Sequence, residues 1–156
     1  MTSLPKSLLP AAAIAAIASP LAAYAAGTLE VVQPWTRPAV AGTNAVGYMV
    51  IANHGGAADA LVKVESPVAS RVEIHSTSMA GGIMSMQKVD TAPVPAAGRT
   101  TFGPGAYHLM LIGLTRTLKP GDQAPATLSF ASGAKLKVAF AVSAGMGPPG
   151  MTGMPH

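Results

Sequence analysis

Apolar and polar residues alternate in short runs along most of this chain, and turn-forming residues separate the runs. A period of two is typical of strands, whose side chains point alternately to the two faces of a sheet. Glycine and proline mark the boundaries, as in Gly55-Gly56 and Pro120-Gly121, because they favour tight turns. Nine strands are predicted on this basis: Leu29–Gln33, Ala45–Asn53, Ala60–Glu65, Arg71–His75, Ile83–Val89, Arg99–Phe102, Tyr107–Gly113, Ala126–Phe130 and Leu136–Val142.

Regularly spaced short strands between turn signals predict an all-β fold, either a Greek-key β-sandwich or a barrel. The alternation also assigns faces. It places Arg71, Glu73 and His75 on the polar face of one strand, with His75 expected at the end of that strand. On another strand it places His108 and Met110 on a common face, about 6.5 to 7 Å apart at Cα.

The N-terminus has the pattern of a secretory signal peptide over residues 1–25. Lys6 precedes an apolar run at 8–18, and residues 23–25 form an A-x-A cleavage site. The mature chain is therefore expected to begin at Ala26 and to be exported to the periplasm. A retained membrane anchor is the alternative, but prolines interrupt the apolar stretch and it is too short to span a bilayer.

Composition narrows the class of protein further. The 156 residues carry a net charge of +4, with scattered cations, and this pattern does not predict a nucleic-acid or anionic-membrane surface. Residues 26–142 fit one domain, and the Gly- and Pro-rich residues 143–156 are predicted to be a flexible tail. The chain has no cysteine, which excludes a disulfide scaffold and a blue-copper site with its thiolate ligand.

Four side chains nevertheless suggest a metal site: His75, Met86, His108 and Met110. Imidazole and thioether together favour the soft ion Cu(I), whereas zinc, magnesium and calcium prefer other donors. Singly, each histidine could be a surface residue and each methionine could fill the core. Together they can form a neutral, roughly tetrahedral shell around a monovalent ion, which limits the cost of desolvating it.

The spacing of these four residues gives a specific resemblance. His75, Met86, His108 and Met110 reproduce the pattern H-x10-M-x21-H-x-M, and segments such as Gly82-Ile83-Met84-Ser85-Met86 also match. In these features the chain resembles the PCuAC family of periplasmic copper chaperones over roughly residues 28 to 142.

The resemblance implies a cupredoxin-like β-sandwich that binds Cu(I) through the four matched positions. It also implies delivery of copper to the copper A centre of cytochrome c oxidase. The implied partners are oxidase subunit II and a Sco-type copper protein. Met79 and Met84 match the methionine-rich neighbourhood, so we expect auxiliary donors or a hydrophobic rim there.

Some family members carry a Met- and His-rich C-terminal extension linked to a second copper site. The tail of this chain is similar, and Met151, Met154 and His156 are candidates for such a site, which would take Cu(II). A tail that binds no metal is the alternative, given its composition.

Three other classes of function compete with copper delivery. A copper enzyme is not favoured, because no paired-carboxylate or Ser–His–Asp motif stands out. A copper storage or resistance protein would use the same ligands, so the sequence leaves this alternative open. In an adhesion-type sandwich, the methionines and histidines would be incidental.

Overall fold

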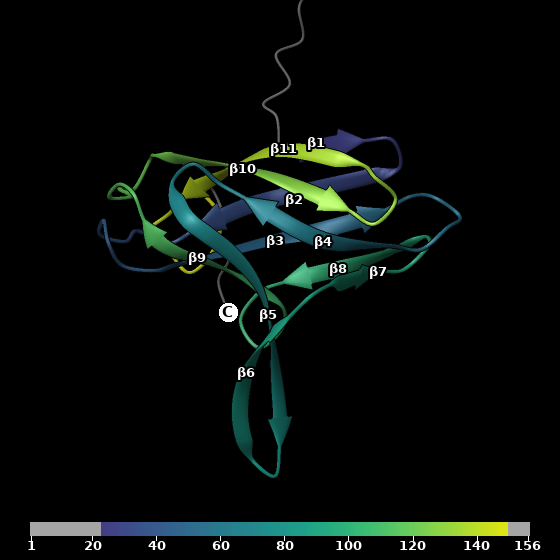
Figure 1. The fold of residues 1–156 in the computed structure, drawn as a ribbon, viewed down its shortest axis with the longest axis horizontal. Coiled ribbons are helices and arrows are strands. Elements are labelled where there is room, and N and C mark those ends of the chain that lie inside the picture. Colours follow the sequence, from purple (N-terminus) through teal and green to yellow (C-terminus); the bar gives the residue numbers. More distant parts are fainter. Residues whose placement is uncertain (1–22, 150–156) are drawn as a thin grey trace, which may run out of the picture.

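The computed structural model describes residues 23–149, and these form an all-β fold (Figure 1). This confirms the predicted fold class. Within the described range the strands are β1 (Ala23–Ala26), β2 (Leu29–Thr36), β3 (Ala45–Asn53), β4 (Asp59–Glu65), β5 (Ala69–Ala80), β6 (Ile83–Val89), β7 (Ala92–Val94), β8 (Gly98–Phe102), β9 (His108–Leu114), β10 (Gln123–Phe130) and β11 (Lys135–Val142).

The strands are hydrogen-bonded in the order β6-β5-β9-β3-β2-β11-β10-β4-β7, with β1 joined to β2 and β8 joined to β3. Most neighbours are antiparallel, but β11 and β2 run parallel. Figure 1 shows this path folding over into layers, which gives the cupredoxin-like sandwich. The order brings β5, β6 and β9 together, although about twenty residues separate β6 from β9 in sequence.

The core lies between the layers and is filled by alternate residues of each strand. In β10 and β11, every second side chain is buried, including Leu128 and Phe140. Met49 on β3 is also buried in this core. Apolar burial of this kind is the main source of stability for a single domain.

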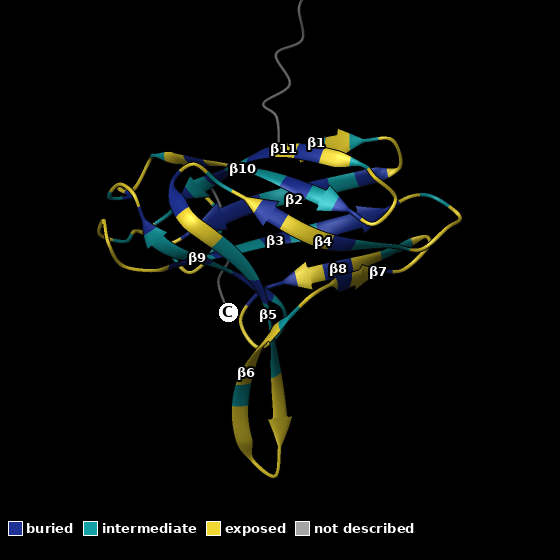
Figure 2. Ribbon diagram, in the orientation of Figure 1, coloured by how far each residue is buried: buried dark blue, intermediate teal, exposed yellow. Residues whose placement is uncertain are grey.

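One hairpin projects from this body. β5 and β6 pair from Ile74–Val89 to Ala80–Ile83, and Figure 2 shows their far ends as mostly exposed. Gly81 and Gly82 form the turn with φ of 61° and 78°. Two successive positive φ angles characterise a tight hairpin turn that glycine adopts without steric strain.

The structure corrects several predicted boundaries. His75 does not end its strand, because β5 continues to Ala80 through its pairing with β6. β7 lies outside the nine predicted strands, and it contains Pro93, a residue type that favours turns. Among the strands of the described range it is hydrogen-bonded only to β4, and it lies at the end of the sheet order, where a residue without an N–H donor is tolerated.

β1 was not predicted either. Its residues Ala23 to Ala25 belong to the expected signal peptide, yet they pair with Val32 to Glu30 of β2. The remainder of that peptide lies outside the described residues. Within residues 23–149, no helix is long and apolar enough to cross a membrane.

Candidate metal centre

The two histidines of the predicted site are direct cross-strand neighbours. His75 on β5 pairs with His108 on β9, so their side chains share one face of the sheet. Their ring centroids lie 5.4 Å apart, and the ring planes are inclined by 41°. The pairing of β5 with β9 therefore brings together two imidazoles that are 33 positions apart in sequence.

The methionines lie on the same face. Met110 is opposite Glu73 on the β5–β9 ladder, and Met86 is opposite Thr77 on the β5–β6 ladder. Because Glu73, His75 and Thr77 alternate along β5, the partners of all three face the same way. All four predicted ligands thus occupy one face of the β6-β5-β9 ribbon.

A cavity of about 280 Å³ lies on this face, and it brings three of the four predicted ligands together. Met86, His108 and Met110 line it, as does Met84, for which the sequence predicts an auxiliary donor or a hydrophobic rim. His75 does not line this cavity. The remaining wall comes from Val46, Tyr48, Thr77 and the loop residues Gly103, Pro104 and Gly105.

The cavity has one buried wall and one exposed wall. His108 is 5% exposed, whereas Met84 and Met86 on the projecting hairpin are 58% and 61% exposed. Met79 on β5 lies directly opposite Met84 on β6 and is likewise exposed. A metal held here would be bound by the buried His108 on the inner wall. It would be accessible to solvent at the outer wall, where the thioethers of Met84 and Met86 are exposed.

Burial determines the protonation of His108. It lowers the pKa of this imidazole, a hydrogen bond to the backbone of Ala106 raises it, and the nearby His75 lowers it. The net effect is a lowered pKa. His108 is therefore neutral at physiological pH and has a lone pair available for a metal.

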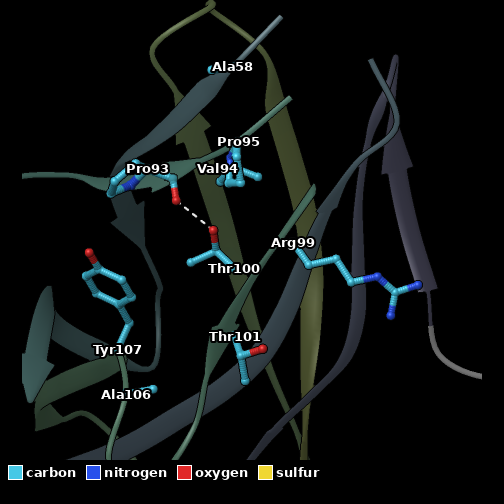
Figure 3. Close-up of a pocket in the computed structure, with 9 residues that line it drawn as sticks. All are labelled: Ala58, Pro93, Val94, Pro95, Arg99, Thr100, Thr101, Ala106 and Tyr107. Atoms are coloured by element: carbon cyan, nitrogen blue, oxygen red, sulfur yellow. Dashed lines mark hydrogen bonds between the residues drawn. The ribbon is translucent and has the colours of Figure 1, made fainter. Parts of the chain in front are cut away.

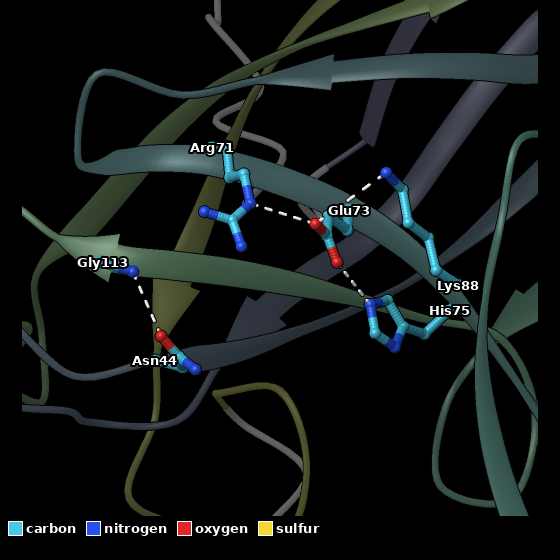
Figure 4. A network of polar contacts seen from close by, with 6 residues as sticks. All are labelled: Asn44, Arg71, Glu73, His75, Lys88 and Gly113. Atoms are coloured by element: carbon cyan, nitrogen blue, oxygen red, sulfur yellow. Dashed lines mark hydrogen bonds and ion pairs between the residues drawn. The ribbon is translucent and has the colours of Figure 1, made fainter.

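A polar network surrounds the other histidine (Figure 4). His75 Nε2 donates to Glu73 Oε2 at 2.9 Å, and Arg71 Nε donates to Glu73 Oε1 at 3.0 Å. The hydrogen bond from His75, followed by that from Arg71, lowers the pKa of the Glu73 carboxyl. Figure 4 also shows a separate contact near the opposite end of β9, where the Gly113 N–H donates to Asn44 Oδ1 at 3.1 Å.

Sequence reasoning assigned no role to Glu73. The alternation along β5 places it on the face of His75, but that pattern does not show a hydrogen bond. The loop from Gly103 to Gly105 lies between two predicted strands, and the structure shows that it closes one side of the cavity.

The tail candidates Met151, Met154 and His156 lie outside the described residues. Within residues 23–149, no three His, Cys, Asp or Glu side chains gather as a metal site. The donor set at the cavity is instead imidazole and thioether, which matches a soft monovalent ion.

A second hollow, of about 710 Å³, lies beside β7 and β8 (Figure 3). Its lining includes Pro93, Val94, Arg99 and Tyr107, and it contains none of the predicted metal ligands. Thr100 Oγ1 donates to the Pro93 carbonyl at 2.6 Å and links the two strands. Among the described residues, the predicted ligands Met86, His108 and Met110 belong to the other cavity.

The fold and site together define a cupredoxin-like β-sandwich with a histidine–methionine cavity on one sheet face. The chain belongs to the family described as putative lipoprotein LpqE-like, whose sequence model matches residues 29–142. A putative lipoprotein of Leifsonia xyli subsp. xyli is 30% identical over 115 residues, which cover 73% of this chain and 69% of that protein.

The chain is also similar to solved structures of copper-bound proteins. The chain is similar to the copper-bound PCuAC domain from PmoF2, with a TM-score of 0.67 and 28% identity, over 79% of this chain and 98% of that domain. It is also similar to the Cu(I)-bound solution structure of DR1885 from Deinococcus radiodurans, with a TM-score of 0.59 and 28% identity. That match covers 73% of this chain and 78% of the other. The expected PCuAC-type relationship is confirmed.

Proposed function

We propose that this protein is an exported Cu(I)-binding metallochaperone that delivers copper to the copper A centre of cytochrome c oxidase. The observation that carries the proposal is the convergence of Met86, His108 and Met110 on one cavity, with His75 beside His108. Copper-bound and Cu(I)-bound relatives of the same fold support the choice of metal.

The four donors His75, Met86, His108 and Met110 would hold the ion. Thioethers bind without losing a proton. Protons therefore compete with copper only for the lone pairs of the imidazoles. The resulting shell is neutral, which suits a +1 cargo better than a divalent ion with its larger desolvation cost.

The exposed hairpin supports a role in transfer. A chaperone must release its cargo by ligand exchange, and an acceptor can approach only where donors are accessible. Met84 and Met86 present their thioethers on the outer wall, while His108 stays buried. An acceptor's donors can then replace the thioethers before the imidazoles release the ion.

The proposed partners are cytochrome c oxidase subunit II as acceptor and a Sco-type copper protein acting beside this one. The proposed location is the periplasm. The lipoprotein description of the family and the signal pattern at residues 1–25 both support export.

Anaerobic Cu(I) titration against a competing chelator tests the copper site. The mature protein is compared with the double variant Met86→Ala, Met110→Ala. We expect tight 1:1 binding by the wild type and a loss of at least about a hundredfold, or about 2.7 kcal/mol, in the variant. Equal affinity in both would remove these two residues as ligands.

Storage or resistance is the second candidate function, because it would use the same donors. Gene deletion distinguishes the two. Loss of a delivery protein is expected to lower oxidase activity at limiting copper, whereas loss of a storage protein is expected to cause sensitivity to excess copper.

A further inference from the structure

We propose that Glu73 fixes the tautomer of His75, so that copper is bound by the Nδ1 atom of that imidazole. Glu73 would then be a positioning residue that acts on the metal through His75. This inference rests on the proposed copper function and adds an atomic assignment to it.

A hydrogen bond joins the side chains of Glu73 and His75. Glu73 is two residues before His75 on β5, and its side chain is only 16% exposed. Its Oε2 lies 2.9 Å from His75 Nε2. A carboxylate can only accept a hydrogen bond, so the shared proton belongs to Nε2.

Two cations orient the Glu73 carboxylate. Arg71 Nε donates to Oε1 at 3.0 Å, and Lys88 Nζ lies 3.9 Å from the same oxygen. Lys88 lies on β6 directly opposite His75, and Met110 lies on β9 directly opposite Glu73. The two cations hold one oxygen, so the other oxygen is left to face His75.

One lone pair remains on the His75 ring. A neutral imidazole has one protonated nitrogen and one lone-pair nitrogen. With Nε2–H committed to Glu73, the lone pair lies on Nδ1. Figure 4 shows this second nitrogen on the side of the ring away from Glu73. Nδ1 is thus the atom of His75 that can bind a metal.

The carboxylate also affects donor strength. A histidine ligand that donates its other N–H to a carboxylate is held in one orientation and becomes more basic. Removal of such a partner typically lowers metal affinity by about 10- to 100-fold. Glu73 is positioned for this role on the face that carries all four predicted ligands.

Long-range ¹H–¹⁵N NMR on the mature protein tests the assignment directly. In the copper-free wild type we expect the proton of His75 on Nε2. After loading with Cu(I), we expect a metal-induced shift at Nδ1 while Nε2 stays protonated. A loaded protein with the proton on Nδ1 and the metal-induced shift at Nε2 would overturn the assignment.

Two substitutions separate the hydrogen bond from the negative charge. Glu73→Ala removes both, and we expect Cu(I) affinity to fall about 10- to 100-fold. Glu73→Gln keeps an acceptor oxygen, so the Nε2 proton is expected to remain and the loss to be below about tenfold. The matched control is Glu65→Gln, which alters an exposed carboxylate paired with Lys63 at 2.7 Å.

The outcomes are distinguishable from failure of the copper function itself. If the wild type binds Cu(I) and Glu73→Ala binds it equally well with an unchanged spectrum, the role of Glu73 is overturned. If no variant and no wild type binds Cu(I), the proposed copper function fails. If the Ala variant does not fold, the NMR measurement on the wild type still tests the inference, because it needs no substitution.

Discussion

His75 and His108 lie directly opposite each other on β5 and β9, with their ring centroids 5.4 Å apart. His75 lies on the strand between β6 and β9, because it is also opposite Lys88 on β6. The body of the sandwich holds one imidazole in its wall, and the other begins the projecting hairpin. The site therefore joins a buried, rigid part of the fold to an exposed part.

The exposed thioether of Met86 is the first target for a test. Met86→Ala should lower Cu(I) affinity by at least about tenfold, which corresponds to about 1.4 kcal/mol, because one of four donors is lost. Competition with a Cu(I) chelator measures the change. Met146→Ala is the matched control, since Met146 is 89% exposed and does not line the cavity. A similar loss in both variants would contradict a specific role for Met86.

Met84 lines the same cavity, and its loss should weaken Cu(I) binding less than the loss of Met86. The reason is that Met84 is expected to be an auxiliary donor beside a complete set of four. Ile83→Ala is the control, because Ile83 precedes Met84 on β6 and so points to the opposite face. Chelator competition on the three variants should give the order Met86, Met84, Ile83 in decreasing loss, and a greater loss for Met84 would show that it is a principal ligand.

Acid should destabilise the copper-free protein through His108. Its pKa is lowered in the folded state, mainly by burial, while an unfolded histidine has a pKa of about 6.5. As pH falls through about 6.5, the unfolded chain takes up a proton before the folded one, so the free energy of unfolding decreases. Denaturant unfolding between pH 7.5 and 5.5 measures this slope, and Glu73 remains ionised throughout that window.

The variant His108→Gln is expected to show a shallower slope over the same range. An unchanged slope would mean that other groups cause the pH dependence.

For Cu(I) binding itself, we expect affinity to be independent of pH above about 7.5, a unit above the ordinary histidine pKa, and to weaken in acid. Undiminished affinity at pH 4 would argue against imidazole ligands.

The hairpin turn offers a test of geometry. Gly82 has a φ of 78°, and a β-branched residue there costs about 1 to 2 kcal/mol. Gly82→Val should loosen the end of the hairpin and weaken Cu(I) binding, because Met84 and Met86 follow the turn. Hydrogen exchange over β5 and β6 should increase. Gly56→Ala is the control, since Gly56 has an ordinary φ and open space around it; equal effects would exclude a specific role for the turn.

Signal cleavage should remove most of β1. Mass spectrometry of the exported protein is expected to show Ala26 as its first residue. A chain that begins at residue 26 should still fold, with a free energy of unfolding within about 1 kcal/mol of a chain that begins at residue 23. Within residues 23–149, β1 is hydrogen-bonded only to β2, although Tyr24 packs against the core. A loss well above this value would make β1 part of the stable domain.

Much of the fold follows from local patterns. Each of the nine predicted strands overlaps an observed strand, because alternate burial leaves a period of two in the sequence. β1 and β7 were missed for different reasons. β1 shares its residues with a cleavage pattern, and β7 contains Pro93, which is compatible with a strand only at an edge.

The sequence alone determined the all-β class, the four candidate donors and the family, because side-chain type, alternation and spacing are local properties. Only the tertiary structure decided that His75 meets His108, that Met84 joins the cavity and that Glu73 binds His75. Those relationships depend on which strands pair and in which register. Register is set by packing across the whole sandwich, and a shift of one residue would turn these side chains to the other face.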